Sequence, residues 1–170
     1  MLKLNLASGT DIRDGWLNLD IVKKWPLAKR ECDIIWDARK DKIPFQDDSV
    51  SEIYAGYLLL HLAPRYHEKV LQEIRRVLLP TGILTVGEVD MKIVMKMWLE
   101  NPESVNLSEL IWGEQGSTHG EELSDYDKHC WGWTEEKLTK FLHSNGFKNI
   151  NRTKIHCSEV FYELTLTCQK

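Results

Sequence analysis

The chain has 170 residues, of which 42% are hydrophobic and 28% are charged, and its formal net charge is −4. This length suits one domain that buries a core of two or three layers, and we expect residues 1–170 to form it. The acidic balance argues against an extensive nucleic-acid surface, because neutralising phosphates requires clustered lysines and arginines. A small polar or nucleotide-like ligand is compatible with it.

The cysteines and the apolar runs indicate the compartment. The four cysteines are scattered without a CxxC pair, and no apolar run approaches the ~20 residues of a membrane span. No basic-then-apolar signal pattern opens the chain. We therefore expect a reduced, cytoplasmic protein with free thiols and no membrane association. His129-Cys130 and His156-Cys157 lack the spacing of a zinc-ligand turn, so no metal is expected.

Short apolar runs in the first third of the chain predict four strands. They cover residues 2–6, 17–21, 32–37 and 50–57. Only about seven residues follow Gly9 before the second run begins, whereas a parallel crossover normally takes about a dozen. The first connecting helix is therefore expected to be shortened or absent.

Helical patterns dominate the middle of the chain. Pro64 suits a first helical turn, and apolar residues at helical spacing continue to Leu78. Pro80-Thr81-Gly82 is expected to end this helix before a strand at 83–86. Residues 91–100 predict a second helix.

A long irregular stretch follows at 101–132. It is polar and contains glycine, and connections of this length inside compact domains are usually functional. We therefore interpret residues 91–132 as a helix followed by an irregular lid segment. Thr134 is expected to cap a further helix, which ends at Asn145-Gly146.

Two strands, at 149–155 and 161–167, complete the pattern. Strands that alternate with helices predict an α/β fold. We expect a Rossmann-like, mainly parallel sheet with helices on both faces and an antiparallel C-terminal strand. In such sheets a ligand binds outside the carboxyl ends of the strands.

The predicted carboxyl ends carry a consistent set of residues. Gly9 lets a ligand approach the backbone, and Asp20 can accept hydrogen bonds from both hydroxyls of a ribose. Asp37 suits the exocyclic amine of adenine, and Glu88 and Asp90 end the fifth strand. Each acid alone is equally explained by a chain that returns to solvent. The ordered set on consecutive strands predicts an adenosine pocket.

The absence of a phosphate-binding motif distinguishes among ligands that contain adenosine. A nicotinamide dinucleotide or a nucleoside triphosphate needs several glycines before a helix N-terminus, or a Walker lysine motif. Neither pattern is present. S-adenosylmethionine carries no phosphate and does not need that cradle.

Five motifs follow one another in the order found in a known family. They are LNLASG (4–9), GWLNLD (15–20), IPFQDDSVSEIYAGYLLLHL (43–62), EIRRVLLPTGIL (73–84) and HCWGWTEEKLTKFLHSNGF (129–147). With these motifs the chain resembles a class I S-adenosylmethionine-dependent methyltransferase. It is most similar to the small, type 11-like, mostly uncharacterised members with a compact LNLGSG…GWxNxD start.

The resemblance implies S-adenosylmethionine as cofactor and assigns its contacts. It implies that residues 7–9 line the methionine end, Asp20 binds the ribose, Asp37 with Ala38 binds the adenine, and Tyr57 lies beneath the transferred methyl. The implied cofactor-binding residues are Leu6, Ala7, Ser8, Gly9, Asp20, Ile21, Asp37, Ala38, Gly56 and Tyr57.

Three positions depart from the family pattern. Ala7 replaces the first motif glycine, Thr81 replaces a glycine of the PGG turn, and Leu60 replaces a common acid of the HxLEH stretch. We interpret Ala7 as reducing the space in which the cofactor could approach the backbone. We interpret the leucine as removing a polar contact near the reacting centre.

Two histidines are candidate catalytic bases. His61 follows the fourth strand and His129 enters the WGW segment, and a histidine titrates near neutral pH. Alternatively, His61 only hydrogen-bonds the following turn; His119 is a weaker candidate. Among the lid tryptophans, Trp112 and Trp131 could stack on an acceptor, whereas Trp133 is expected to fix its loop to the core.

These observations favour methyl transfer to a small or surface-presented polar acceptor. A sulfonium methyl needs an aligned acceptor and exclusion of water more than a conspicuous catalytic group. The alternatives are a binding or regulatory module that has lost transfer, which Ala7 and Leu60 would suit, and a disfavoured nicotinamide oxidoreductase. We expect a monomer or a homodimer.

Overall fold

The computed structural model describes residues 1–113, 126–153 and 163–170. The candidate His119, the cysteine-histidine pair at 156–157 and the predicted strand ends at 154–155 and 161–162 lie outside the described residues.

Within that part of the chain, seven strands form one sheet in the order β3-β2-β1-β4-β5-β7-β6. β1 to β5 are parallel to one another, whereas β7 is antiparallel to both β5 and β6. The predicted Rossmann-like sheet with an antiparallel C-terminal strand is therefore confirmed. The strands are β1 (Lys3–Leu6), β2 (Leu17–Asp20), β3 (Ile34–Ile35), β4 (Val50–Gly56), β5 (Leu78–Val89), β6 (Lys148–Arg152) and β7 (Glu163–Gln169).

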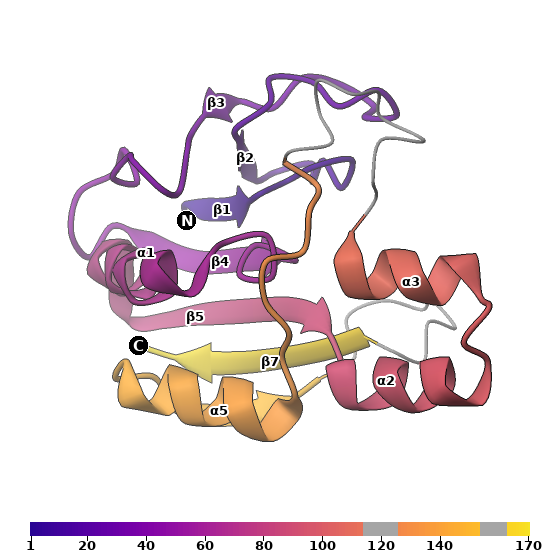
Figure 1. Cartoon of the computed structure of the whole chain (residues 1–170). Helices are drawn as coiled ribbons and strands as arrows, with labels where there is room; N and C mark the ends of the chain where they lie inside the picture. The colour runs from indigo at the N-terminus through magenta and orange to yellow at the C-terminus, as the bar shows by residue number, and fades with distance from the viewer. Residues whose placement is uncertain (114–125, 154–162) are drawn as a thin grey trace.

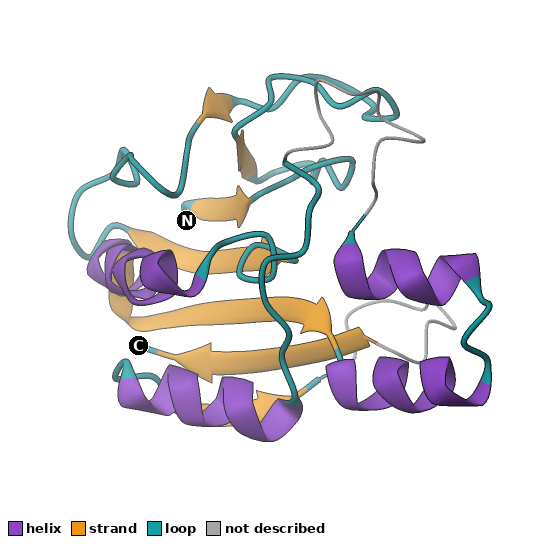
Figure 2. Cartoon of the chain, viewed as in Figure 1, coloured by secondary structure: helices purple, strands orange, loops and turns teal. Residues whose placement is uncertain are grey.

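The helices are α1 (Pro64–Val77), α2 (Met91–Glu100), α3 (Val105–Trp112) and α5 (Glu135–Ser144). Figures 1 and 2 show α1 and α5 on the same face of the sheet, with α2 and α3 past the carboxyl end of β5. The links at 7–16, 21–33 and 36–49 contain no helix. Helices were expected on both faces, and the described part of the chain has its two sheet-packing helices on one.

The two faces of the sheet differ in polarity accordingly. Successive side chains of a strand point to opposite faces, so Leu4 and Leu6 share the face that joins the main hydrophobic cluster under α1 and α5. Asn5 lies on the other face, where the side chains are largely polar. That face carries Lys3, Asn5, Asn18, Glu52, Tyr54, Thr85 and Thr165.

A pair of buried asparagines holds the short β1–β2 link. The Asn5 amide donates to the side-chain oxygen of Asn18 (2.9 Å) and to the carbonyl of Asp11 (2.6 Å). Asn18 accepts from the amide of Arg13 and donates to the carbonyls of Arg13 and Trp16. Backbone groups that an intervening helix would have paired internally therefore find side-chain partners.

Arg13 closes the same link over the polar face. Its guanidinium lies 3.4 Å from the ring centroid of Tyr54 on β4 and pairs with Asp11. Lys3 of β1 contacts the Trp16 ring and pairs with Glu52. Stacked cations and aromatic rings thus cover part of the face that lacks a helix.

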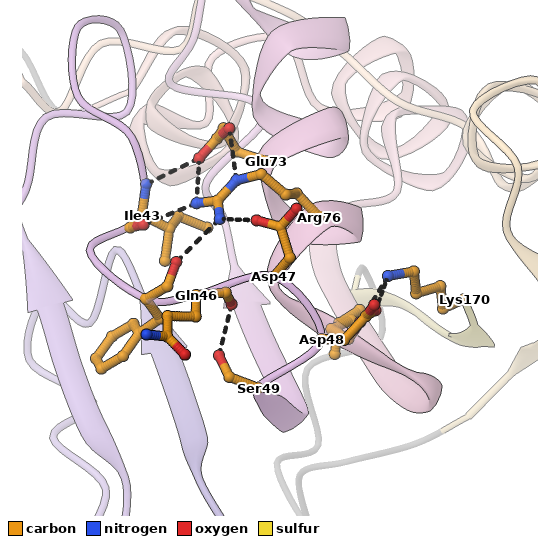
Figure 3. Close-up of polar contacts among 10 residues, drawn as sticks. Ile43, Gln46, Asp47, Asp48, Ser49, Glu73, Arg76 and Lys170 are labelled. Atoms are coloured by element: carbon orange, nitrogen blue, oxygen red, sulfur yellow. Dashed lines mark hydrogen bonds and ion pairs between the residues drawn. The ribbon is translucent and has the colours of Figure 1, made fainter.

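An ion-paired cluster fixes the link between β3 and β4 onto α1 (Figure 3). Arg76 donates to the carbonyls of Ile43 and Phe45 and pairs with Asp47. It also pairs with Glu73, one helical turn earlier, which accepts from the amide of Ile43. The motifs at 43–62 and 73–84 therefore meet through this contact.

Two element boundaries differ from expectation. The helix ends at Val77 and β5 begins at Leu78, so Pro80-Thr81-Gly82 lies inside the strand and does not separate it from the helix. The pairing shifts register here, because Val50 faces Leu78 while Glu52 faces Ile83. This irregularity accommodates the proline within a ladder.

The second difference is α3, which lies in the stretch expected to be irregular. Ser104 caps it by accepting a hydrogen bond from the amide of Leu107. The capping serine before an apolar run was the available signal, but the polar residues around it hid the helix. The predicted caps of α5 agree with the structure: Thr134 accepts from the Lys137 amide, and Gly146 follows with φ +85°.

The asparagine pair gives a stability prediction. We expect Asn18→Ala to lower the free energy of unfolding by about 2–4 kcal/mol, because buried groups around it lose their partners. Urea unfolding followed by far-UV circular dichroism measures this. Asn106→Ala, on the exposed surface of α3, is the control, with a change within about 0.5 kcal/mol. Equal stability of Asn18→Ala and the original chain would contradict the assigned role.

Candidate functional site

A cavity of about 540 Å³ opens at the carboxyl ends of β1, β2 and β4. Both histidine candidates line it. So do all the predicted cofactor residues except Leu6, which is fully buried in the main core below it. The predicted residues brought together here are Ala7, Ser8, Gly9, Asp20, Ile21, Asp37, Ala38, Gly56, Tyr57, His61 and His129.

The backbone turns sharply where β1 and β4 enter the cavity. Ala7 (φ +52°), Gly9 (φ +50°) and Tyr57 (φ +56°) all adopt the left-handed conformation. A side chain in this region costs roughly 1–2 kcal/mol, which explains why the family pattern has a glycine where this chain has Ala7. Gly56 is required for another reason, since a Cβ there would lie 2.7 Å from the Tyr54 ring.

Asp20 connects both sides of the β1–β2 opening. Its Oδ2 accepts from the amide of Gly9 (2.8 Å), and its Oδ1 accepts from the amide of Val22 and the indole Nε1 of Trp25, both at 2.9 Å. The residue is buried. The conformation of the turn at Gly9 is thus tied directly to the carboxylate.

Asp37 has a different environment. Arg39 donates to both carboxylate oxygens, at 2.9 Å each, and Lys40 lies 3.3 Å from Oδ2. The hydrogen bonds from Arg39 lower the pKa of Asp37 to about 2, against its partial burial. The carboxylate that was expected to contact adenine therefore already accepts two hydrogen bonds from the planar guanidinium of Arg39. Ala38 lines the cavity beside it.

Two polar atoms in the cavity wall are buried without a hydrogen-bond partner among the described residues. They are the hydroxyl of Ser8 and the indole nitrogen of Trp36. Buried polar groups are normally hydrogen-bonded. Their location next to Gly9 and Asp37 suits a polar ligand that supplies the missing partners.

The two candidate histidines lie side by side. Their ring centroids are 5.0 Å apart at an interplanar angle of 67°. Nδ1 of His61 is 3.3 Å from the carbonyl of Lys128, and Nδ1 of His129 is 3.0 Å from the carbonyl of Leu110. Burial lowers the pKa of each ring to about 4, and for His129 the neighbouring His61 adds to this. Both rings are therefore neutral at pH 7.

Hydrogen bonds to two other segments of the chain hold the turn that carries His61. Glu88, at the end of β5, is fully buried and accepts from the amides of Leu59 and Leu60. Burial raises the pKa of Glu88 well above its usual value. The carbonyl of Leu60 accepts from the amides of Cys130 and Trp131. Figure 1 shows residues 126–133 crossing in front of the sheet before α5.

The tryptophans of the lid region have separate roles. Trp133 is buried and stacks near Phe141 and His67, as expected for a residue that fixes its loop to the core. Trp112 and Trp131 are exposed and do not line the cavity. Their proposed stacking on an acceptor has no support from this arrangement.

The sequence analysis missed several residues that line the cavity. For Trp36 a signal was available, because it directly precedes Asp37 at the end of a predicted strand. The others depend on contacts between distant segments or on loop conformation, which no local pattern predicts. The missed residues include Trp25, Trp36, Arg39, Leu110, Tyr126 and Asp127.

In residues 1–113, 126–153 and 163–170, no cluster of three or more histidine, cysteine or acidic side chains is arranged to hold a metal ion. None of the helices described above has the length and apolar character of a membrane span.

Comparisons with known proteins agree with this geometry. Residues 9–86 match the profile of the methyltransferase domain family. A search of curated proteins found no match in sequence. Solved structures give many matches, and those described below share the fold of S-adenosylmethionine-dependent methyltransferases. The resemblance stated from the motifs is confirmed.

Three solved structures illustrate the similarity. A SAM-dependent methyltransferase from Archaeoglobus fulgidus aligns with TM-score 0.64 and 11% identity, over 99% of this chain and 85% of the other. A SAM-dependent methyltransferase from Methanosarcina mazei gives 0.61 and 17%, over 99% and 91%. The Burkholderia thailandensis 1,6-didemethyltoxoflavin-N1-methyltransferase, with bound 1,6-didemethyltoxoflavin and S-adenosylhomocysteine, gives 0.61 and 15%, over 99% and 70%.

The histidine pair predicts how stability depends on pH. The folded chain keeps both rings neutral until about pH 4, whereas an unfolded chain protonates them near pH 6.5. Unfolding therefore takes up protons in this window, and the free energy of unfolding falls as the pH falls, by ~1.4 kcal/mol per pH unit for each proton.

Replacing both rings isolates this effect. We expect the double variant His61→Asn, His129→Asn to show a shallower loss of stability between pH 6.5 and about 4, measured by urea unfolding at each pH. His143→Asn, at an exposed position in the last turn of α5, should keep the original slope. An unchanged slope in the double variant would show that the two rings protonate normally in the folded chain.

Proposed function

We propose that this protein transfers the methyl group of S-adenosylmethionine to a small polar acceptor held against the His61–His129 side of the cavity. The observation that carries the proposal is the convergence of Gly9, Asp20 and Tyr57 on one nucleoside-sized hollow. The cavity volume of about 540 Å³ falls within the range of small-molecule sites.

The residues of the cavity fit this cofactor. Asp20 accepts hydrogen bonds and suits ribose hydroxyls, while the partnerless hydroxyl of Ser8 and indole nitrogen of Trp36 offer further contacts. Ala38 and Trp36 provide the wall for the adenine. Asp37 contributes less than expected, because its oxygens already bind Arg39.

S-adenosylmethionine supplies an electrophilic methyl group when bound, and the chain's own residues do the remainder. Tyr57, in its left-handed turn at the end of β4, and Leu58 form the wall where the methyl group would lie. Leu62, Val89 and Leu110 exclude water. His61 and His129 present neutral rings that can receive a proton. Alignment and exclusion of water account for much of the rate increase such a reaction needs.

The second candidate is a binding module that has lost transfer. Ala7 adopts the left-handed conformation despite its side chain, so the departure at this position still permits the turn. Leu60 is buried in the core and does not line the cavity. Because residue 60 does not line the cavity, the absence of an acid at this position takes no polar group away from the cavity wall. These two departures do not favour loss of activity.

The thiols bear on the compartment. Among the described cysteines, Cys32, Cys130 and Cys168 are all unpaired. Free thiols persist in reducing environments, and we extend the proposal to a cytoplasmic enzyme.

Isothermal titration with S-adenosylhomocysteine tests the proposed function. We expect binding at micromolar to submillimolar concentration. Asp20→Asn should weaken it by about tenfold, because the side-chain NH₂ group replaces one of the two oxygens that accept hydrogen bonds. Asp14→Asn, an exposed residue of the same link, should bind as the original chain does. No binding at millimolar concentration would overturn the proposal. Binding without methyl transfer to any acceptor would favour the second candidate.

A further inference from the structure

The two acids assigned to the nucleoside are already hydrogen-bonded by donors of the chain itself. Asp20 and Asp37 are buried and line the cavity. A carboxylate offers about four lone-pair positions, two on each oxygen. A position that an internal donor occupies is closed to a ligand. The occupied positions therefore decide which groups of a bound nucleoside each acid can recognise.

Among the described residues, three donors reach the side chain of Asp20. The amide of Val22 and the indole Nε1 of Trp25 donate to Oδ1, both at 2.9 Å, and the amide of Gly9 donates to Oδ2 at 2.8 Å. Both positions on Oδ1 are thus taken, and one position remains on Oδ2. Asp20 has room for one further donor, whereas a ribose presents two hydroxyls.

Trp25 is the side-chain donor of the three, since the other two donate from backbone amides. Its ring belongs to a hydrophobic cluster with Ile12 and Ala28 that is separate from the main core. Packing therefore holds the indole in place in addition to the hydrogen bond. Trp25 also lines the cavity. Its N–H occupies the position on Oδ1 of Asp20 to which a second ribose hydroxyl would otherwise donate.

Building on the proposed function, we propose that Trp25 limits Asp20 to a single ribose hydroxyl, which makes Trp25 a specificity-determining residue of the cofactor site. One of the two hydroxyls then contributes little to binding. In Trp25→Phe an aromatic ring remains while the indole donor is lost. Oδ1 of Asp20 then gains a position, and the second hydroxyl contributes to binding.

Calorimetry with the 2′-deoxy and 3′-deoxy forms of S-adenosylhomocysteine tests this proposal. In the original chain we expect one deletion to weaken binding by about tenfold and the other by less than about threefold. In Trp25→Phe both deletions should weaken it by about tenfold. Trp98→Phe is the matched control, because the Trp98 indole nitrogen is buried without a hydrogen-bond partner and the residue does not line the cavity. This control should behave as the original chain does.

The comparison of the two deoxy forms in the original chain needs no variant to fold. Two equal tenfold losses there, or no loss from either deletion, would overturn the role of Trp25, as would unequal losses that persist in Trp25→Phe. Hydrogen exchange gives a second measurement. The Trp25 indole N–H should exchange slowly with water with and without S-adenosylhomocysteine, and fast exchange in the complex would also overturn the role. Failure of the parent compound to bind would overturn the proposed function instead.

A different set of contacts surrounds the second acid. Arg39 donates to Oδ1 of Asp37 from its backbone amide (3.0 Å) and from Nε (2.9 Å), and to Oδ2 from a terminal nitrogen (2.9 Å). Nζ of Lys40 lies 3.3 Å from Oδ2. These contacts lower the pKa of Asp37 to about 2, so the group is a carboxylate at neutral pH and has no proton to donate. Four donors therefore face its four lone-pair positions.

From these contacts we infer that Arg39 prevents Asp37 from recognising the exocyclic amine of adenine, so the site binds a purine without this amine nearly as well. The amine is a hydrogen-bond donor and requires a lone pair that no other donor occupies. In Arg39→Met the aliphatic part of the side chain remains and the guanidinium is lost. Each oxygen of Asp37 then gains one position at which the amine can donate.

The 6-deamino form of S-adenosylhomocysteine tests this inference by calorimetry. In the original chain it should bind less than about threefold more weakly than the parent compound, and in Arg39→Met about tenfold more weakly. Arg65→Met is the control and should behave as the original chain, because Arg65 is exposed, does not line the cavity and lies over a tyrosine ring as Arg39 does.

A tenfold loss from removal of the amine in the original chain would overturn the inference about Arg39. Equal binding of both forms by Arg39→Met would also overturn it. Absence of binding by the parent compound would count against the proposed function, and neither result for the amine affects the role of Trp25.

Discussion

The hydrogen bond between the buried side chains of Asn5 and Asn18 is the contact on which the site depends. This bond joins the middle of β1 to the middle of β2. The same two side chains also hydrogen-bond backbone carbonyls of the ten residues between the strands. The link contains no helix, and its internal backbone hydrogen bonds include those from the amide of Asp11 to the carbonyl of Ser8 and from the amide of Trp16 to the carbonyl of Arg13. The two asparagines satisfy further backbone groups of the link. This link begins at Ala7, contains Gly9 and ends just before β2, the strand whose last residue is Asp20. The geometry of the cavity entrance is therefore a consequence of two amide side chains on the polar face of the sheet.

Much of this arrangement could be predicted from the sequence because it is local or periodic. Strand alternation and the cap at Thr134 each indicated an element that the structure contains, and the short spacing after Gly9 indicated the link without a helix. The position of the cavity followed from a general property of parallel sheets, whose carboxyl ends share an edge. Leu6 was among the cofactor residues implied by the resemblance, whereas alternation along the strand directs it into the core.

What was not predicted depends on loop conformation or on contacts between distant segments. Trp25 donates its indole N–H to Asp20, five residues earlier, because of the conformation of the link at 21–33. Asp127 approaches His61 because the amides of Cys130 and Trp131 both donate to the carbonyl of Leu60. No repeat or spacing marks the second contact, since it is held by backbone groups that every residue has. The start of β5 was missed for the opposite reason: Pro80 and Gly82 are strong local signals for a break, and the register shift absorbs them.

Three acids that end neighbouring strands show how the surroundings of a residue decide its role. Asp37 is held by Arg39 and has little capacity left for a ligand. Glu88 is fully buried and fixes the turn before His61. Asp20 accepts from Gly9, Val22 and Trp25 and lines the cavity. Asp20 depends on the β1–β2 link, whereas the His61 wall depends on Glu88 and Leu60. The two halves of the site are thus supported by different parts of the chain, so the wall that carries His61 and His129 can change without disturbing the contacts of Asp20.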